Sequence, residues 1–156
     1  MSRAAPAPPP AYYEALGRLT AIASLVEIEI GLAGWAAESG EPYTEDWPFG
    51  DAPGKAIRYL EDRLGLLGAE LRTAAEAAIA EYRRLSDVRH RAVHGVLTLD
   101  PSLDPGEQWV VKSARHGLLP MDHLQDEMRQ ATVELRELAR RVDGLRAAIA
   151  RERSAR

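Results

Sequence analysis

The residues of this chain that could carry out chemistry are concentrated in one short polar segment. It runs from Arg83 to Gly95 and contains the run Arg89-His90-Arg91-Ala92-Val93-His94. Histidine transfers protons near neutral pH, and the planar guanidinium of arginine binds two oxygens of a phosphate at once. These residue types therefore indicate acid–base chemistry beside a phosphate group.

Arg89 lies where a helix is expected to contact its neighbours. The apolar stripe that precedes it, continued by four and then three positions, reaches Arg89 and Ala92. Because an unpaired buried charge is costly, the guanidinium must meet a carboxylate, open into a cleft or face another subunit. Glu27 and Glu29, which interrupt an otherwise apolar stretch, are the candidate pairing acids. An arginine that is merely buried against an acid satisfies the same pattern.

His94 occupies the last turn of the expected helix, next to Gly95. A histidine there can cap the terminal carbonyls and interact with the helix dipole, or it can hold a proton for acid–base work. We predict that Gly95 is a left-handed cap that stops the helix. His90 and His94 are spaced as half of a helical metal site, but no third ligand is evident nearby, so no metal is predicted.

Length and composition indicate the class of fold that must position these residues. The chain has 156 residues, of which 46% are hydrophobic and 6% aromatic. This balance favours one domain of packed helices over a β-sandwich. The absence of cysteine excludes a disulfide framework, thiolate catalysis and Cys-ligated zinc or iron–sulfur sites.

Charge and hydropathy bear on partners and location. A formal net charge of −4 speaks against a broad nonspecific grip on nucleic acid, although it leaves room for a local basic site. No apolar run approaches the roughly 20 residues that cross a bilayer. Residues 1–10 also lack the apolar region of a secretory signal. We therefore expect a cytoplasmic protein with no membrane partner.

Apolar periodicity divides the chain into a few elements. Residues 1–10 are expected to form a disordered Pro-rich arm, residues 11–150 a single helical domain and residues 151–156 a frayed tail. The predicted fold class is all-α, a four-helix up-and-down bundle with a short β-hairpin between helices three and four. The helices are expected over about 11–39, 57–67, 69–94 and 122–150.

The connecting segments carry predictions of their own. Residues 96–99 and 109–111 are expected to pair as the hairpin, and Gln125 is expected to complete a capping box at the start of the last helix. The aromatic residues of the loop 41–54 are expected to fasten it onto the core rather than to bind a ligand. His116 and His123 are expected at the surface.

The run from Arg89 to His94 resembles the signature of the HEPN (higher eukaryotes and prokaryotes nucleotide-binding) superfamily. That signature is an arginine, a polar residue and then a histidine after four to six intervening positions, at the end of a helix in a helical bundle. Arg89, His90 and His94 fit the version with four intervening residues, and Gly95 follows directly. The resemblance covers residues 11–150, and its specificity rests on this one motif.

The resemblance implies a function. Catalytic members of the superfamily are metal-independent endoribonucleases that need no cofactor, work as dimers and serve as toxins or phage-defence effectors. Carried over, Arg89 stabilises the phosphate, His90 is the polar motif residue and His94 is the acid–base histidine, with Glu27, Glu29 and Arg91 as supporting residues. RNA supplies its own nucleophile, the 2′-hydroxyl, so RNA is the expected partner, together with a second copy and an antitoxin or other protein.

Two observations keep a second reading open. Members that an antitoxin inactivates by adenylylation carry a tyrosine two residues after the histidine, where this chain has Val96. Many members have also lost catalysis, so the alternative is a noncatalytic bundle that binds a partner protein or a nucleotide. Other enzyme classes are disfavoured because the chain has no Gly-rich phosphate loop, no HExxH and no GxSxG motif.

Overall fold

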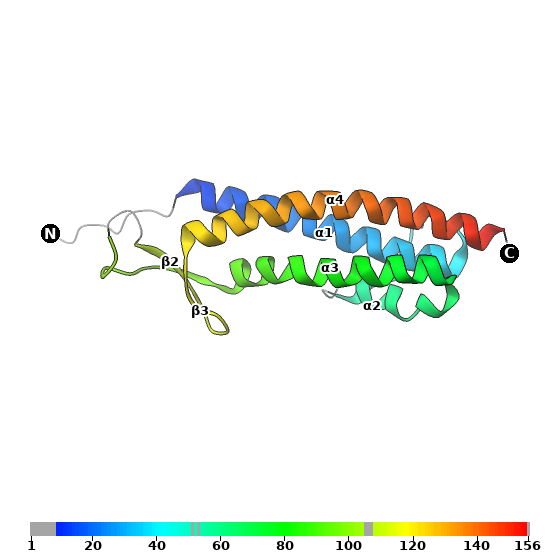
Figure 1. Cartoon of the computed structure of the whole chain (residues 1–156), viewed down its shortest axis with the longest axis horizontal. Helices are drawn as coiled ribbons and strands as arrows, with labels where there is room; N and C mark the ends of the chain where they lie inside the picture. The colour runs from blue at the N-terminus through cyan, green and yellow to red at the C-terminus, as the bar shows by residue number, and fades with distance from the viewer. Residues whose placement is uncertain (1–8, 51, 53, 105–107, 156) are drawn as a thin grey trace.

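The computed structural model describes residues 9–50, 52, 54–104 and 108–155. Over these residues the protein is mostly helical, with one small antiparallel sheet (Figure 1). The predicted helical class is therefore confirmed. The arm predicted for residues 1–10 lies outside the described residues up to position 8, and the first helix already includes Pro10.

Three long helices form the body of the molecule: α1 (Pro10–Ser39), α3 (Ala69–His94) and α4 (Met121–Ser154). In Figure 1, α1 and α4 run in the same direction side by side, and α3 runs in the opposite direction below them, so the arrangement is not the up-and-down order that was predicted. The helix predicted over 57–67 is shorter than expected: α2 (Lys55–Glu61) is followed by a single 3-10 turn, Leu64–Leu66. Because α2 has only seven residues, it covers only part of α1, which it contacts.

The three long helices bury the stripes that their periodicity predicts. The side chains of Leu19, Ile30 and Leu135 are fully buried, and α1 packs chiefly against α4. α1 also has the length and composition to cross a membrane, which corrects the sequence-based expectation that no such stretch exists. Core helices of soluble proteins share that property, and in this structure the core-facing stripe of α1 packs in the hydrophobic core.

The predicted hairpin is present, and the sheet has one strand more. β1 (Val96–Leu99) pairs with β2 (Trp109–Ser113), which pairs with β3 (Gly117–Pro120), all antiparallel. Gly117 makes the second turn possible because its φ of 72° is open to glycine at no steric cost. The sequence analysis missed β3 because a strand of four residues that ends in proline resembles a connecting segment.

The predicted ends of α3 and α4 need correction. Gly95 is extended, with φ −79° and ψ 141°, and is not a left-handed cap. α4 follows Pro120 without any side-chain cap, so the capping box with Gln125 is wrong. The helix also continues to Ser154, into the segment that was expected to fray.

Gly95 is required for close packing rather than for backbone freedom. A Cβ there would lie 2.1 Å from Cγ1 of Val111 and 2.7 Å from the backbone oxygen of Arg91. We expect Gly95→Ala to lower the free energy of unfolding by about 1–3 kcal/mol, the usual cost of overpacking. Gly144→Ala is the control because its Cβ would meet no atom within 4 Å, so it should raise stability by about 1 kcal/mol. Urea denaturation followed by circular dichroism measures both, and equal effects would contradict this account.

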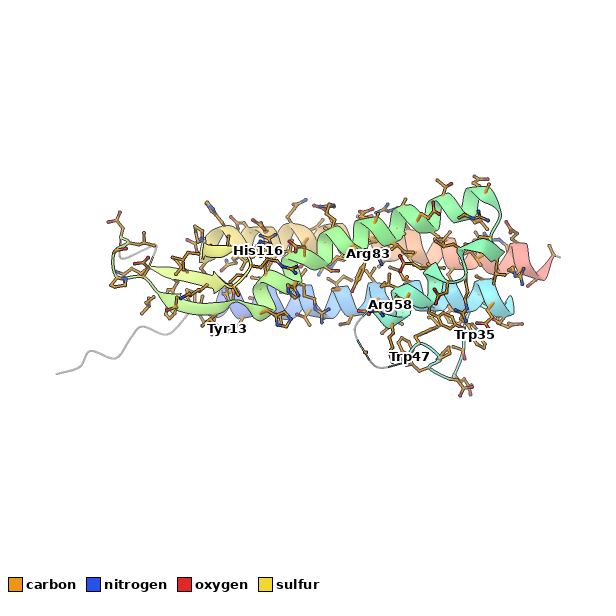
Figure 2. All side chains as sticks on the ribbon, turned by 90° about the horizontal axis from the view of Figure 1, so that it is seen from below. Tyr13, Trp35, Trp47, Arg58, Arg83 and His116 are labelled. Atoms are coloured by element: carbon orange, nitrogen blue, oxygen red, sulfur yellow. The ribbon has the colours of Figure 1, made fainter. Side chains whose placement is uncertain are left out.

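The loop before α2 is fastened to α1 by Phe49, as predicted, whereas the loop's other aromatic residues, Tyr43 and Trp47, are 65% and 44% exposed. Phe49 is buried and contacts Trp47 and Tyr59 edge to face, with ring centroids 4.5 and 4.9 Å apart. The indole of Trp35 donates to the backbone oxygen of Tyr43. In Figure 2, Trp35 and Trp47 lie at the end of the molecule opposite to His116. This packing holds α2 beside α1.

Candidate functional site

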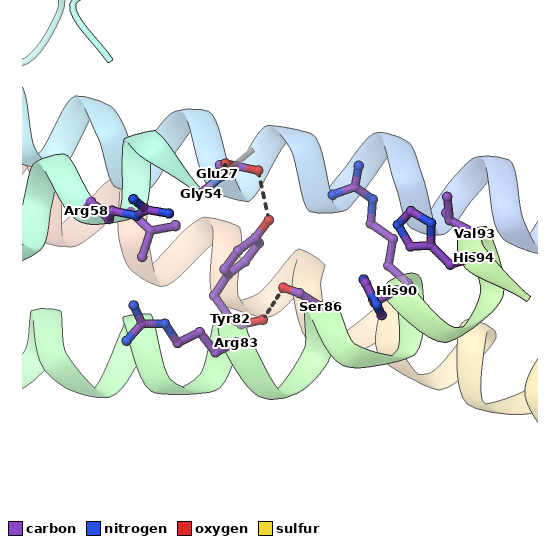
Figure 3. A pocket seen from close by; sticks show the side chains of 11 residues that line it. Glu27, Gly54, Arg58, Tyr82, Arg83, Ser86, His90, Val93 and His94 are labelled. Carbon is purple, nitrogen blue, oxygen red and sulfur yellow. Dashed lines mark hydrogen bonds between the residues drawn. The ribbon is translucent and has the colours of Figure 1, made fainter. Parts of the chain in front are cut away.

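A pocket of about 410 Å³ opens where α1, α2 and α3 meet (Figure 3). It contains Arg89, His90 and His94 from the final turns of α3, so the three residues of the sequence motif lie in one cavity. The other residues that line it are Glu27, Gly54, Ile57, Arg58, Tyr82, Arg83, Ser86 and Val93.

The side chain of Arg89 lines this pocket. Its side chain is partly buried, and no carboxylate of the described part of the chain lies within ion-pair distance of it. Its positive charge opposes the rise in the pKa of Tyr82 that burial causes. The sequence left three environments open for Arg89: a carboxylate partner, a cleft or another subunit. In this structure Arg89 lies in a cleft, where its guanidinium is available to an anion.

His90 and His94 lie next to each other at one end of the pocket (Figure 3). Both side chains are exposed, and their ring centroids are 4.4 Å apart with the planes inclined by 50°. The residues that the structure describes contain no group of three or more potential metal-ligating side chains. The arrangement offers two ring nitrogens for proton transfer on the same face of α3.

Glu27 contributes to the pocket, but not as the partner of Arg89. One carboxylate oxygen accepts a hydrogen bond from the Tyr82 hydroxyl at 3.1 Å, and the other accepts from the backbone N–H of Gly54 at 2.5 Å. Burial, first, and the Glu27 charge raise the pKa of Tyr82 to about 12, so the phenol stays protonated and donates. Glu27 therefore joins α1 to α3 and to the start of α2.

Glu29 lies outside the pocket, which corrects its assignment as a supporting residue beside Arg89. Its carboxylate pairs with Nη1 of Arg146 on α4 at 2.5 Å. The Arg146 side chain is only 4% exposed; it also contacts Asp143 and donates to the hydroxyl of Tyr43. The sequence suggested a buried arginine paired with Glu29. The structure contains such a pair, but the arginine is Arg146 and not Arg89.

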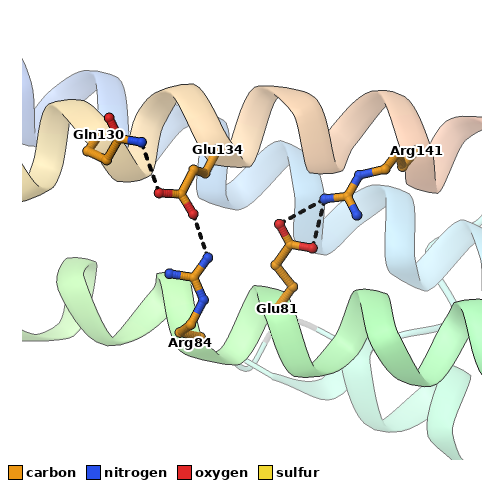
Figure 4. Close-up of polar contacts among 5 residues, drawn as sticks. All are labelled: Glu81, Arg84, Gln130, Glu134 and Arg141. Atoms are coloured by element: carbon orange, nitrogen blue, oxygen red, sulfur yellow. Dashed lines mark hydrogen bonds and ion pairs between the residues drawn. The ribbon is translucent and has the colours of Figure 1, made fainter.

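Arg91 also points away from the pocket. Its guanidinium pairs with Asp87 at 3.1 Å, as expected from the spacing, and with Glu127 of α4 at 2.6 Å. Figure 4 shows two further links on this side of α3, from Arg84 to Glu134 and from Glu81 to Arg141, at 2.5 and 2.7 Å. These pairs lie on a different face of α3 from the one that carries Arg89 into the pocket.

Two basic residues of the pocket were not singled out by the sequence analysis. Arg83 belonged to the polar segment, whereas Arg58 lies on a different helix and gave no signal of its own. Arg83 is paired with Glu61 at 2.8 Å. No ion pair or side-chain hydrogen bond joins Arg58 to any described residue. With these arginines the pocket is locally basic, although the whole chain has a net charge of −4.

No family model, curated protein or solved structure matches the chain. The function is therefore argued from the chemistry of the pocket and from the motif within it.

Proposed function

We propose that this protein is a metal-independent endoribonuclease of the HEPN type that requires no cofactor. The observation that carries the proposal is the placement of Arg89, His90 and His94 together in one locally basic pocket at the end of α3. We also propose that α1, α2, α3 and α4 correspond to the four helices of that superfamily, with α2 as the short one.

The chemistry needs only these side chains and the RNA. A histidine removes the proton from the 2′-hydroxyl, and the 2′-oxygen attacks the adjacent phosphorus. The Arg89 guanidinium stabilises the negative charge that develops on the phosphorane. The bond from phosphorus to the 5′-oxygen then breaks, and that oxygen takes a proton from a second acid. The products are a 2′,3′-cyclic phosphate and a 5′-hydroxyl.

The direct test is incubation of end-labelled single-stranded RNA with the purified protein in EDTA. Cleavage with 2′,3′-cyclic phosphate ends supports the proposal. RNA or nucleotide binding without cleavage would instead favour the noncatalytic alternative. The biological setting that we propose is a cytoplasmic toxin or phage-defence effector under the control of an antitoxin or another protein partner.

A homodimer forms part of the proposal because in-line cleavage needs an acid and a base on opposite sides of the phosphorus. His90 and His94 of one chain lie on one helix face, so they approach from the same side. A twofold axis near Arg89 would bring a second His94 to the other side. Two apolar residues, Val93 within the motif and Val96 just after it, are 46% and 65% exposed and suit burial in such an interface.

Val93→Glu is expected to separate the dimer. The substitution would bury a carboxylate in the proposed interface, which should raise the dimer dissociation constant at least about tenfold and lower RNA cleavage with it. Val133→Glu is the matched control, since Val133 is 53% exposed on α4. Sedimentation velocity over a concentration series measures both constants. A wild-type protein that stays monomeric throughout the series would contradict the assembly.

A further inference from the structure

The pocket has a second basic end, away from the histidines. In Figure 3, Arg58 and Arg83 lie at the end opposite to His90 and His94. Arg58 belongs to α2 and Arg83 to α3, so two elements contribute to this end.

The two arginines at this end differ in their availability to a ligand. Both Arg83 guanidinium nitrogens Nη1 and Nη2 contact the Glu61 carboxylate, at 2.8 and 2.9 Å, so its charge is compensated. Arg58 makes no ion pair with a described residue, and the same holds for Arg89. Glu27, the acidic residue among the described lining residues, already accepts two hydrogen bonds. Among the described residues that line the pocket, the guanidiniums of Arg58 and Arg89 are therefore the two without a carboxylate partner.

The ends of the pocket are too far apart to hold a single phosphate. Arg83, which lies at the Arg58 end, is six positions before Arg89 on α3, which corresponds to about 9 Å along the helix axis. A stacked nucleic-acid strand advances about 3.4 Å per nucleotide. A strand laid along α3 would thus place different phosphates at the two ends.

α2 holds Arg58 in a fixed position. The Gly54 N–H, directly before α2, donates to Glu27, and the Tyr59 hydroxyl donates to Glu38. Arg63 pairs with Glu38 at 2.7 Å and lies over the Tyr59 ring, 3.3 Å from its centroid. Because the helix is anchored, little backbone freedom is lost when Arg58 binds an anion.

We propose that Arg58 binds a second phosphate of single-stranded RNA, displaced along α3 from the phosphate held at Arg89. This inference rests on the proposed function and adds a substrate requirement, since a dinucleotide without terminal phosphates has a single phosphate and cannot supply one to each arginine. A phosphate contact carries no sequence information, so the requirement is for length and not for a base. Arg58 is assigned to binding and not to proton transfer.

The test measures binding in the His94→Ala background, so that cleavage does not interfere. Fluorescence anisotropy gives the dissociation constants of a decaribonucleotide and a diribonucleotide over a salt series. Arg58→Ala should weaken decanucleotide binding about tenfold, the value of one charge-assisted contact, and leave dinucleotide binding unchanged. The salt dependence, plotted as log K against log salt, should become shallower by about 0.7, the contribution of one phosphate contact in a single strand. With His94 intact, Arg58→Ala should raise KM for the decanucleotide and leave kcat unchanged.

Arg151→Ala is the matched control because it removes the same charge from an exposed arginine near the end of α4. An equal loss of affinity in both variants would overturn the inference, since net charge alone would then explain it. An unchanged decanucleotide affinity in Arg58→Ala would overturn it as well and leave the proposed nuclease intact. A wild-type protein that binds neither oligonucleotide would reject the nuclease and the subsite together.

Discussion

Replacing His94 by alanine is expected to abolish RNA cleavage, with a loss of about 100- to 10,000-fold, the usual contribution of a general acid or base. The His94 side chain is exposed at the pocket, so its truncation should leave the fold and its circular dichroism unchanged. His116→Ala is the control because His116 is also exposed but lies at the turn between β2 and β3. Gel electrophoresis of labelled RNA in EDTA measures both rates.

Arg89→Lys extends this experiment to the phosphate contact. Lysine keeps the charge but not the planar fork that binds two oxygens, so most of the activity should be lost. Strict dependence on an added divalent metal, together with a fully active His94→Ala variant, would reject the mechanism. Activity that survives in Arg89→Lys would place phosphate stabilisation elsewhere in the pocket.

Replacing Arg146 by alanine is expected to lower the free energy of unfolding by about 3 kcal/mol, because it removes a buried guanidinium and leaves the partly buried carboxylate of Glu29 without its partner. Arg146 joins α4 to Glu29 of α1 and lies over the ring of Tyr43, 4.2 Å from its centroid. Arg141→Ala is the control, since Arg141 is 59% exposed in its pair with Glu81 and should cost no more than about 1 kcal/mol. Urea denaturation measures both, and equal losses would contradict the importance of burial.

The Arg146 variant should also respond to pH in a defined direction. Burial raises the pKa of Glu29, and the Arg146 guanidinium opposes that rise. Without Arg146 the folded-state pKa should move further above the unfolded-state value. The contribution of Glu29 to stability is then fully present below the pKa that Glu29 has in the unfolded chain. It is lost as pH rises through the higher pKa that Glu29 has in the folded protein. The difference from the wild type should therefore be larger at pH 7 than at about pH 4, near the ordinary pKa of glutamate.

Much of this protein was predictable from residue order alone. The stripe that includes Tyr82 and Leu85 required α3 to bury one face, and continuing it placed Arg89 next to that face. The run from Arg89 to His94 lies within two helical turns, so its residues had to end up close together wherever α3 packed. Two short apolar runs, 96–99 and 109–111, on either side of a turn-rich segment were enough to predict the hairpin. These are local relations, and helix and strand periodicity encodes them.

Contacts between elements were decided by the tertiary structure. Glu27 and Glu29 are two positions apart, so they face different neighbours on a helix, and sequence spacing could not say which one meets an arginine. Only the packed bundle shows that Glu27 faces Tyr82 and that Glu29 faces Arg146.

Two further features were also decided by contacts between elements. They are the position of Arg58 at the pocket and the close packing at Gly95. Each depends on how closely a second element approaches, α2 in the first case and Val111 of β2 in the second. Periodicity along one element carries no information about the distance to another. The motif residues were therefore readable from the sequence, while the pocket that gives them a ligand-sized space, and its second basic end, required the fold.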